Sequence, residues 1–369
     1  MKIICDKASL VKGVNTVSKA VPAKTTMPIL ECILIDTTEN HILLTANDME
    51  LGIQTEVDGE ILEAGMIAVD ARIFSDIVRK LPDNEVTIVT DENLTATISC
   101  EKAEFTINGQ SGDTFVFLPE VEKEESIEIS QFTLKEMIQQ TIFSIADNES
   151  NKMMTGEMFE IQNNGLRVVA LDGHRIAIRK TELKTPGKDQ KLIIPGKTLS
   201  EISKILSGEI ESMVTISYTK NHILFEFDET VVVSRLIEGE YFKIDQMLSS
   251  DYDTKVVVNK KELSNCIDRA LLLVKEGDKK PLIIQIQDEE MKLKISSQLG
   301  SMNEDIGIEK EGKDLLIGFN PKFLIDALRV IEDEEVTLYF MNAKSPCFIR
   351  DKDETYIYLI LPVNFNSVT

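Results

Sequence analysis

Hydrophobic residues recur with helical spacing in three similar segments of the chain. Each segment carries mostly apolar residues at offsets 0, 3, 4, 7, 8 and 11, the stripe that an amphipathic helix buries along one face. The pattern repeats roughly every 125 residues. The stripes are Leu10, Gly13, Val14, Val17, Ser18 and Val21; Leu134, Met137, Ile138, Thr141, Ile142 and Ile145; and Leu263, Cys266, Ile267, Ala270, Leu271 and Val274.

A second helix pattern, with core residues at offsets 0, 3, 4 and 7, also occurs three times at a similar spacing. Asp70 is a candidate N-cap for the first copy, and Asn320 followed by Pro321 provides a cap with proline at N1 for the third. Pro82 ends the first copy. The core residues are Phe74, Ile77, Val78 and Leu81; Leu199, Ile202, Ser203 and Leu206; and Leu324, Ala327, Leu328 and Ile331.

Strand-like segments accompany both helix patterns. A near-identical tripeptide follows each second-pattern helix, at Val86–Ile88, Val214–Ile216 and Val336–Leu338. Polar turns such as Glu39-Asn40 and Asn163-Asn164-Gly165 precede β-branched runs, which is typical of hairpins. We therefore predict an α+β fold of three similar domains, each with two helices packed on antiparallel sheets. The predicted domains are residues 1–123, 124–248 and 249–369.

Basic residues occupy the same two positions in every second-pattern helix, two residues before and five residues after the first core residue. Both positions lie opposite the core stripe, so these side chains should be exposed. Lys80 adds a further charge in the first copy, whereas the first-pattern helices mix Lys12 and Lys19 with Glu136 and Asp268. The six recurring residues are Arg72, Arg79, Lys197, Lys204, Lys322 and Arg329.

The net charge gives these positions their significance. With 63 acidic and 40 basic residues, the chain carries a formal charge of −23, which should repel nucleic acid from most of its surface. DNA contact would have to be confined to a surface of opposite local charge. Basic helix positions without a base-reading helix suit phosphate contacts, so binding should be sequence-independent and sensitive to salt.

Length and cysteine content narrow the class of protein. A chain of 369 residues is too long for one ordinary core, and it has no apolar run near the ~20 residues that span a bilayer. Its start lacks a signal-peptide pattern. The odd number and scattered positions of the five cysteines indicate a reduced, cytoplasmic protein with neither a disulfide framework nor a zinc site. These are Cys5, Cys32, Cys100, Cys266 and Cys347.

Catalytic motifs are scarce. The sequence has no phosphate-binding glycine loop, zinc-protease motif or nucleophile elbow. His41 and His222 stand in matching Asn-His-Ile-Leu contexts and read as strand starts after turns. Asp172 and His174 form the only suggestive acid–histidine pair, and a turn between strands explains it better than catalysis. We therefore expect no enzyme activity and no cofactor or metal, and a hydrolase that uses this pair is the alternative.

Four short segments resemble hallmarks of the DNA polymerase III beta subunit family, the bacterial sliding clamps. They are Thr26–Leu30, Asp172–Arg175, Arg235–Tyr241 and Leu361–Val363, and they follow the family's order and spacing over the whole chain. The resemblance implies a head-to-tail homodimer that closes a ring of six domains around duplex DNA. The implied partners are double-stranded DNA, a second copy, the polymerase III catalytic subunit, the clamp loader, and other polymerases and repair proteins with a short clamp-binding motif. A scaffold that binds only proteins is the alternative that the repeats alone leave open.

The resemblance also assigns residues to a peptide pocket and a dimer interface, and the recurring basic positions make up most of a predicted DNA site. A hydrophobic pocket between the second and third domains is expected to bind partner peptides through Met154, Leu171, Gly173, His174, Ile176, Phe242, Met247, Leu359, Leu361, Pro362 and Val363. DNA is expected to contact Lys24, Arg72, Arg79, Lys80, Lys152, Lys197, Lys204, Lys322 and Arg329. The dimer interface is expected to pair Phe105 and Ile107 with Leu272 and Leu273.

Three departures from the family pattern bear on these sites. Phe242 stands where the family usually has proline, which should reshape one wall of the pocket. The tail of residues 364–369 is longer than usual and lacks a common arginine, which affects the pocket's C-terminal rim. Lys24 replaces an arginine near the DNA path and keeps its charge.

Overall fold

A computed structural model describes residues 1–123, 125–147, 151–275 and 280–365. Their contacts divide them into two compact units. The first unit comprises the described residues of 1–135 and 197–236, and the second comprises those of 136–196 and 237–365. The second predicted repeat therefore contributes elements to both units.

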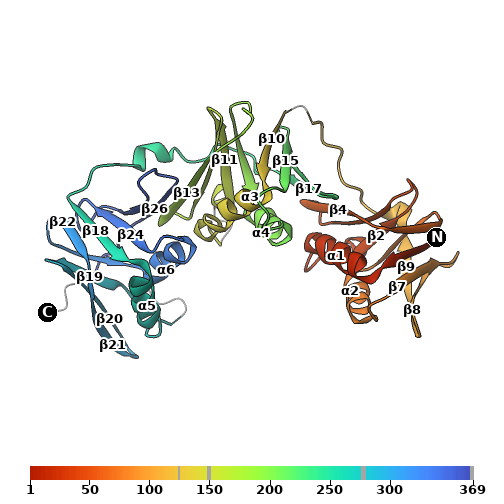
Figure 1. Cartoon of the computed structure of the whole chain (residues 1–369), viewed down its shortest axis with the longest axis horizontal. Helices are drawn as coiled ribbons and strands as arrows, with labels where there is room; N and C mark the ends of the chain where they lie inside the picture. The colour runs from red at the N-terminus through yellow and green to blue at the C-terminus, as the bar shows by residue number, and fades with distance from the viewer. Residues whose placement is uncertain (124, 148–150, 276–279, 366–369) are drawn as a thin grey trace. The chain divides into compact units, whose positions relative to one another are not determined.

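All six helices that the hydrophobic pattern predicts are present (Figure 1). In each helix the residues at offsets 0, 3 and 4 are buried, apart from the half-buried Ser203. No helix in the described part of the chain has the length and apolar character needed to cross a membrane. The helices are α1 (Lys7–Val17), α2 (Ala71–Lys80), α3 (Gln131–Gln139), α4 (Gly196–Ile205), α5 (Lys260–Leu271) and α6 (Pro321–Val330).

The first-pattern helices end sooner than their stripes predict. α1 ends at Val17 and α3 at Gln139, so the last stripe residues of each lie in 3-10 turns or beyond. At both ends a hydroxyl group donates to the carbonyl four residues earlier, from Ser18 to Val14 at 2.6 Å and from Thr141 to Met137 at 2.7 Å. Such local bonds compete with continued α-helix, which apolar spacing alone does not reveal.

Each first-pattern helix begins at a polar N-cap whose side chain accepts a backbone N–H from the first turn. The distances are 2.9 Å from Ala8 N to Asp6 Oδ2, 3.1 Å from Thr133 N to Ser130 Oγ, and 3.0 Å from Glu262 N to Asn259 Oδ1. The two caps predicted for the second pattern are confirmed. Asp70 accepts from Ile73 N at 2.8 Å, and Asn320 accepts from Lys322 N at 3.0 Å.

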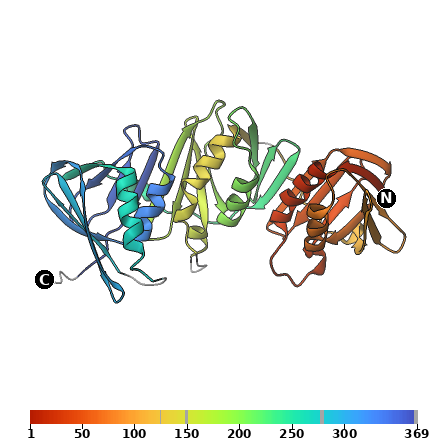
Figure 2. The same ribbon diagram turned by 60° about the horizontal axis from the view of Figure 1, so that its bottom comes forward.

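The first unit holds one antiparallel sheet of thirteen strands among its described residues. Its order is β10-β15-β16-β17-β4-β3-β2-β6-β9-β8-β7-β1-β5. Figure 2 shows α1 and α2 side by side against this sheet. The strands are β1 (Lys2–Asp6), β2 (Cys32–Asp36), β3 (Ile42–Asn47), β4 (Leu51–Val57), β5 (Gly59–Glu63), β6 (Met66–Asp70), β7 (Glu85–Thr90), β8 (Thr95–Cys100), β9 (Ala103–Ser111), β10 (Glu125–Ser130), β15 (Met213–Tyr218), β16 (His222–Phe227) and β17 (Thr230–Arg235).

The second unit contains two antiparallel sheets, of nine and four strands within the described ranges. Their orders are β14-β11-β12-β13-β26-β25-β24-β18-β22 and β21-β20-β19-β23. The strands are β11 (Gly156–Gln162), β12 (Gly165–Leu171), β13 (Arg175–Glu182), β14 (Gln190–Pro195), β18 (Thr254–Asn259), β19 (Leu282–Gln287), β20 (Glu290–Ser297), β21 (Gly300–Gly307), β22 (Glu309–Gly312), β23 (Leu315–Phe319), β24 (Glu335–Phe340), β25 (Cys347–Arg350) and β26 (Tyr356–Ile360).

Strand pairing repeats three times in the same form. The strand before each first-pattern helix pairs with the strand that carries the recurring tripeptide, as β1 with β7, β10 with β15 and β18 with β24. In each pair the residue before the helix N-cap faces the first residue of the tripeptide. The matched residues are Cys5 and Val86, Ile129 and Val214, and Val258 and Val336. The triplication read from the sequence is therefore present in the register of the sheets.

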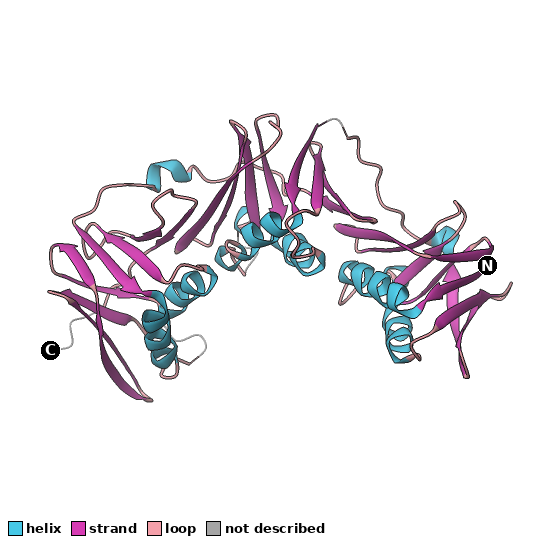
Figure 3. Ribbon diagram, viewed as in Figure 1, coloured by secondary structure: helices cyan, strands magenta, loops and turns pink. Residues whose placement is uncertain are grey.

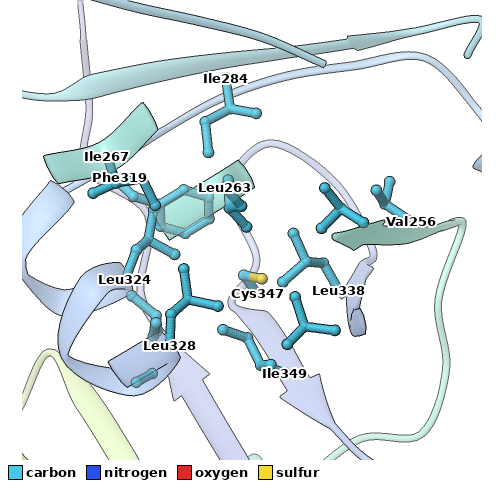
Figure 4. Close-up of a cluster of buried hydrophobic side chains, with 14 of the residues drawn as sticks. Val256, Leu263, Ile267, Ile284, Phe319, Leu324, Leu328, Leu338, Cys347 and Ile349 are labelled. Carbon is cyan, nitrogen blue, oxygen red and sulfur yellow. The ribbon is translucent and has the colours of Figure 1, made fainter. Parts of the chain in front are cut away.

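The six α-helices lie on one side of the strands against which they pack (Figure 3). The core of the third repeat forms where α5 and α6 meet the two sheets of the second unit. Leu263, Ile267, Leu324 and Leu328 from the helices point toward Phe319 and its neighbours on the strands (Figure 4). All five cysteines are free and buried, Cys347 among them in this core.

Candidate nucleic-acid, peptide and subunit interfaces

All nine residues predicted to contact DNA have exposed side chains. Six of them are the recurring pairs on α2, α4 and α6, and Lys80 is the last residue of α2. Lys24 lies in the loop after α1, and Lys152 begins the short helix η5 (Lys152–Thr155). The exposure agrees with the position of these residues opposite the buried stripes.

Four of these nine cations are paired with a carboxylate of the same unit. Arg79 bonds Asp76 at 2.5 Å, Lys204 bonds Glu201 at 2.8 Å and Arg329 bonds Asp268 at 2.9 Å, while Lys197 contacts Asp48. The other five form no ion pair within the described ranges, and they carry the positive charge that is free for a ligand. These are Lys24, Arg72, Lys80, Lys152 and Lys322.

Several residues predicted to bind peptides gather in one apolar cluster of the second unit. Leu171, Ile176 and Leu359 are buried in it, and Met154 and Phe242 pack against it half-buried. Met247 projects to solvent from the short helix η6 (Ile244–Met247), with 55% of its surface exposed. We refer to this cluster with Met247 and the terminal segment Leu361–Val363 as the apolar site.

The terminal segment Leu361–Val363 borders the turn between β12 and β13. Leu361 N donates to the His174 carbonyl at 2.9 Å, and Val363 N donates to the Gly318 carbonyl at 2.8 Å. Leu361 itself is 38% exposed. The chain end is therefore held by backbone bonds while it presents apolar side chains next to the turn, where chain ends are more often polar and frayed.

Asp172-Gly173-His174-Arg175 is a strand-linking turn, as the sequence favoured. The Asp172 carboxylate accepts from His174 N at 2.9 Å and from Arg175 N at 3.1 Å, and its other oxygen bonds Arg175 Nε at 2.9 Å. The His174 ring stacks on Phe323, with 5.9 Å between centroids. The bonds of Asp172 thus go to the turn and not to the imidazole.

Sequence reasoning missed residues that hold this site in place. The buried Arg175 bonds Asp326 on α6 at 2.7 Å and lies 4.5 Å above the Phe323 ring, so it ties the turn to that helix. Tyr241 packs edge-on against Phe242 and donates its hydroxyl to the Val169 carbonyl at 3.3 Å. Arg175 and Tyr241 belong to segments that resemble the family, but the residues they contact are distant in sequence, so no local pattern predicts these contacts.

The predicted interface residues lie beside strand edges that are open among the described residues. Phe105 is 40% exposed and lies in the first half of β9. Among the described residues this half pairs only with β8, because β6 pairs only with the last residues of β9. In the described part of the second unit, β21 pairs only with β20. Leu272, which caps α5, is 78% exposed, and the half-buried Leu273 lies near Gly300 at the start of β21.

Models of the three domains of the DNA polymerase III beta subunit match nearly the whole chain. The N-terminal model matches residues 1–119, the central model 128–243 and the C-terminal model 245–364. The chain belongs to the DNA polymerase III beta subunit family. Beta subunits consist of these three domains, so the predicted three-domain α+β fold is confirmed.

Relatives within the beta subunit family align from end to end. The beta sliding clamp of Staphylococcus epidermidis is 34% identical over 98% of this chain and 99% of its own length. A solved beta subunit structure from Eubacterium rectale is 67% identical, with a TM-score of 0.95 over 99% of this chain and 100% of that chain. The Bacillus subtilis sliding clamp structure is 35% identical, also with a TM-score of 0.95, over 99% and 100% of the two chains.

The departures from the beta subunit pattern have distinct surroundings. The ring of Phe242 lies 5.7 Å from that of Tyr241, so it adds to the apolar wall of the site. In the tail, the Phe365 ring packs close to Gly318, and a Cβ added to Gly318 would lie 2.5 Å from that ring. Residues 366–369 of the tail lie outside the described residues.

Proposed function

We propose that this chain is a processivity factor that closes a ring of two copies around duplex DNA and tethers a polymerase to it. The single observation that carries the proposal is the recurrence of exposed basic residues at matched positions of α2, α4 and α6, in a chain with a net charge of −23. Three clamp domains, with boundaries near residues 123 and 248, would each contribute one such helix face.

Repetition of the strands supports head-to-tail assembly. The third strand after each first-pattern helix is β4, β13 or β21, and the third strand after each second-pattern helix is β9, β17 or β26, so the strands of each set are equivalent. Within the chain β4 pairs with β17 and β13 pairs with β26, both antiparallel. The remaining equivalents are β21 and β9, and both have open edges among the described residues. We infer that β21 of one copy pairs with β9 of the next, and that two such contacts close the ring.

DNA contact in this proposal is electrostatic and independent of sequence. Phosphates would meet Lys24, Arg72, Lys80, Lys152 and Lys322 directly, since these five have no carboxylate partner among the described residues. The other four cations, Arg79, Lys197, Lys204 and Arg329, would exchange a carboxylate for phosphate. Retention would then depend on ring closure more than on tight contact, and it would weaken as salt rises.

Partner proteins would bind the apolar site. A short peptide with glutamine followed by leucine and phenylalanine anchors would cover Met247, Phe242 and Leu361, while Gly173, His174, Pro362 and Val363 form the rim. Methionine and aromatic side chains adapt to several sequences, which suits a site shared by the polymerase III catalytic subunit, a clamp loader, and other polymerases and repair proteins. We place this activity in the cytoplasm, without cofactor and without catalysis, and assign ring opening to a separate loader.

The test compares topologies of DNA. Protein loaded by a clamp loader onto nicked circular duplex should remain bound through gel filtration and should leave when one cut linearises the circle. Blocking both ends of the linear DNA should restore retention. Equal retention on open linear and circular DNA would show ordinary groove or backbone binding and would refute the ring.

A further inference from the structure

The turn that carries His174 in the second unit has a counterpart in the first. Asp48 precedes β4 as Asp172 precedes β13, and the next residues, Met49 and Gly173, both have positive φ, of 77° and 88°. The Asp48 carboxylate accepts from Glu50 N at 3.0 Å and from Leu51 N at 2.7 Å, as Asp172 accepts from His174 N and Arg175 N. The two turns are therefore equivalent residue by residue.

The chain end that borders each turn is also equivalent. Arg235 N donates to the Glu50 carbonyl at 2.9 Å, just as Leu361 N donates to the His174 carbonyl. In the sheets Val233 faces Gly52, where Leu359 faces Ile176. The first unit thus repeats the backbone of the apolar site with different side chains, and an arginine stands where the apolar site has Leu361.

A groove lies at this place in the first unit, with a volume of about 270 Å³. Met49, Val116, Phe117, Pro119, Val233 and Arg235 are among its lining residues. Met49 and Phe117 are 50% and 51% exposed, although both are large apolar side chains. The side chain of Leu118 lies over Gly52, within 2.1 Å of an added Cβ, and so occupies the place that Ile176 fills in the apolar site. The volume suits one aliphatic or aromatic side chain of a ligand.

Two charges of opposite sign flank this groove. The exposed Arg235 guanidinium and the exposed Glu50 carboxylate have no hydrogen bond or ion pair within the described ranges. An unpaired guanidinium next to apolar surface favours a carboxylate ligand, because its planar fork donates two parallel hydrogen bonds. The chain has a net charge of −23, so an acidic segment would bind at a local site of positive charge such as this one.

We propose that the Met49–Arg235 groove is a second docking site, for an extended segment of a partner protein with one apolar anchor and an adjacent acidic residue. The anchor covers Met49 and Phe117, and the carboxylate bonds Arg235. Because Arg235 stands where the apolar site has Leu361, this groove selects a different sequence from the apolar site.

The experiment uses the full-length protein with ¹³C-methyl methionine, because Met49 reports on this groove while Met154 and Met247 report on the apolar site. The probes are the acetylated hexapeptide Ser-Gly-Phe-Asp-Gly-Ser and the same peptide with lysine in place of aspartate. The aspartate peptide should shift the Met49 signal in a saturable titration and leave the other two unchanged. The lysine peptide should bind at least about tenfold more weakly.

A charge swap makes the test specific. Arg235→Glu should reverse the preference between the two peptides, whereas Lys220→Glu, an equal charge change on a nearby exposed turn, should leave it unchanged. Equal thermal unfolding of the variants would show that both are folded. The proposal is overturned if the aspartate peptide shifts only Met154 and Met247, if it shifts no methionine at millimolar concentration, or if Arg235→Glu does not change the preference.

Discussion

A buried carboxyl group beside the apolar site is the clearest test of the structure at the scale of one residue. Glu157 on β11 is completely buried, and desolvation raises the pKa of its carboxyl from 4.5 to about 8. Tyr241 packs against the apolar site, and its pKa is raised mainly by burial and further by the neighbouring Glu157 carboxyl. Glu157 therefore carries a proton in the folded state at neutral pH, whereas it is ionised in the unfolded chain.

Replacing Glu157 with glutamine should stabilise the protein, and by more as pH rises. Between pH 4.5 and about 8 the folded state binds one proton more than the unfolded state. The free energy of unfolding therefore falls by about 1.4 kcal/mol per pH unit in that window, and the fall ends once pH passes the folded pKa, where Glu157 is ionised in both states. Calorimetry at pH 5, 6.5 and 8 should show a Glu157→Gln midpoint that exceeds wild type by a growing margin.

Glu160 is the matched control on the same strand, since it bonds Arg167 at 2.5 Å and Lys191 at 2.7 Å. Glu160→Gln should lower the unfolding midpoint at pH 8, because it leaves part of a largely buried ion-pair network unpaired. A margin for Glu157→Gln that stays constant from pH 5 to pH 8 would contradict a protonated Glu157.

Met247 decides peptide binding at the same scale. Its side chain is 55% exposed beside buried apolar groups, so Met247→Glu should abolish binding of a glutamine-leucine-phenylalanine peptide while leaving the fold intact. The wild-type affinity should be around micromolar, since few anchors are buried against the ordering cost of a flexible peptide. Isothermal calorimetry measures the wild-type affinity and the loss of binding in Met247→Glu. Met27→Glu, at a methionine 42% exposed in the first unit, should bind as wild type does; full binding by Met247→Glu would move the site elsewhere.

At the scale of elements, the sequence predicted what depends on local pattern. Stripe residues such as Leu10 and Phe74 are buried, and the cap at Asp70 forms, because helix phase and capping depend on near neighbours. The end of α1 was missed because the bond from Ser18 to the Val14 carbonyl is invisible to hydrophobic spacing. The same helix phase predicted that the basic residues are exposed, but it did not predict that four of them pair with nearby carboxylates.

Those ion pairs determine how the basic helix faces should be tested. Reversing Arg79, Lys204 or Arg329 would also break contacts with Asp76, Glu201 or Asp268, so unpaired residues give a cleaner result. The triple variant Arg72→Glu, Lys80→Glu and Lys322→Glu should lose most retention on circular DNA and should keep its unfolding midpoint, because exposed substitutions usually cost less than about 0.5 kcal/mol. Retention is measured after loading at several salt concentrations.

A matched control separates local from global charge in this test. Reversing Lys220, Lys344 and Lys352 changes the net charge by the same amount, and these residues lie exposed in strand-linking turns. That variant should retain DNA nearly as wild type does. Equal loss in both triple variants would attribute retention to overall charge, and no loss in either would remove the basic helix faces from the mechanism.

At the scale of the whole molecule, the repeats connect the fold to assembly. The apolar site brings together Leu171 and Leu359 from distant strands, and only the pairing of β13 with β26 joins them. Sequence spacing cannot reveal such a pairing, so the residues of this site came from a family resemblance and not from pattern. The triplication itself could be read from the sequence. It implies a contact between two copies, because β21 and β9 correspond to strands that pair in the other repeats but do not pair with each other among the described residues.

That contact yields the last prediction. Leu272 is 78% exposed at the end of α5, and Leu273 lies beside the start of β21, so Leu272→Lys with Leu273→Ala should prevent pairing of β21 with a second copy. Sedimentation should give a monomer, and retention on circular DNA should be lost while peptide binding at the apolar site persists. Leu62→Lys, at a leucine 49% exposed on β5, should remain a dimer. A dimer that survives the double change would assign the interface to other surfaces, and a monomer still retained on circles would separate retention from ring closure.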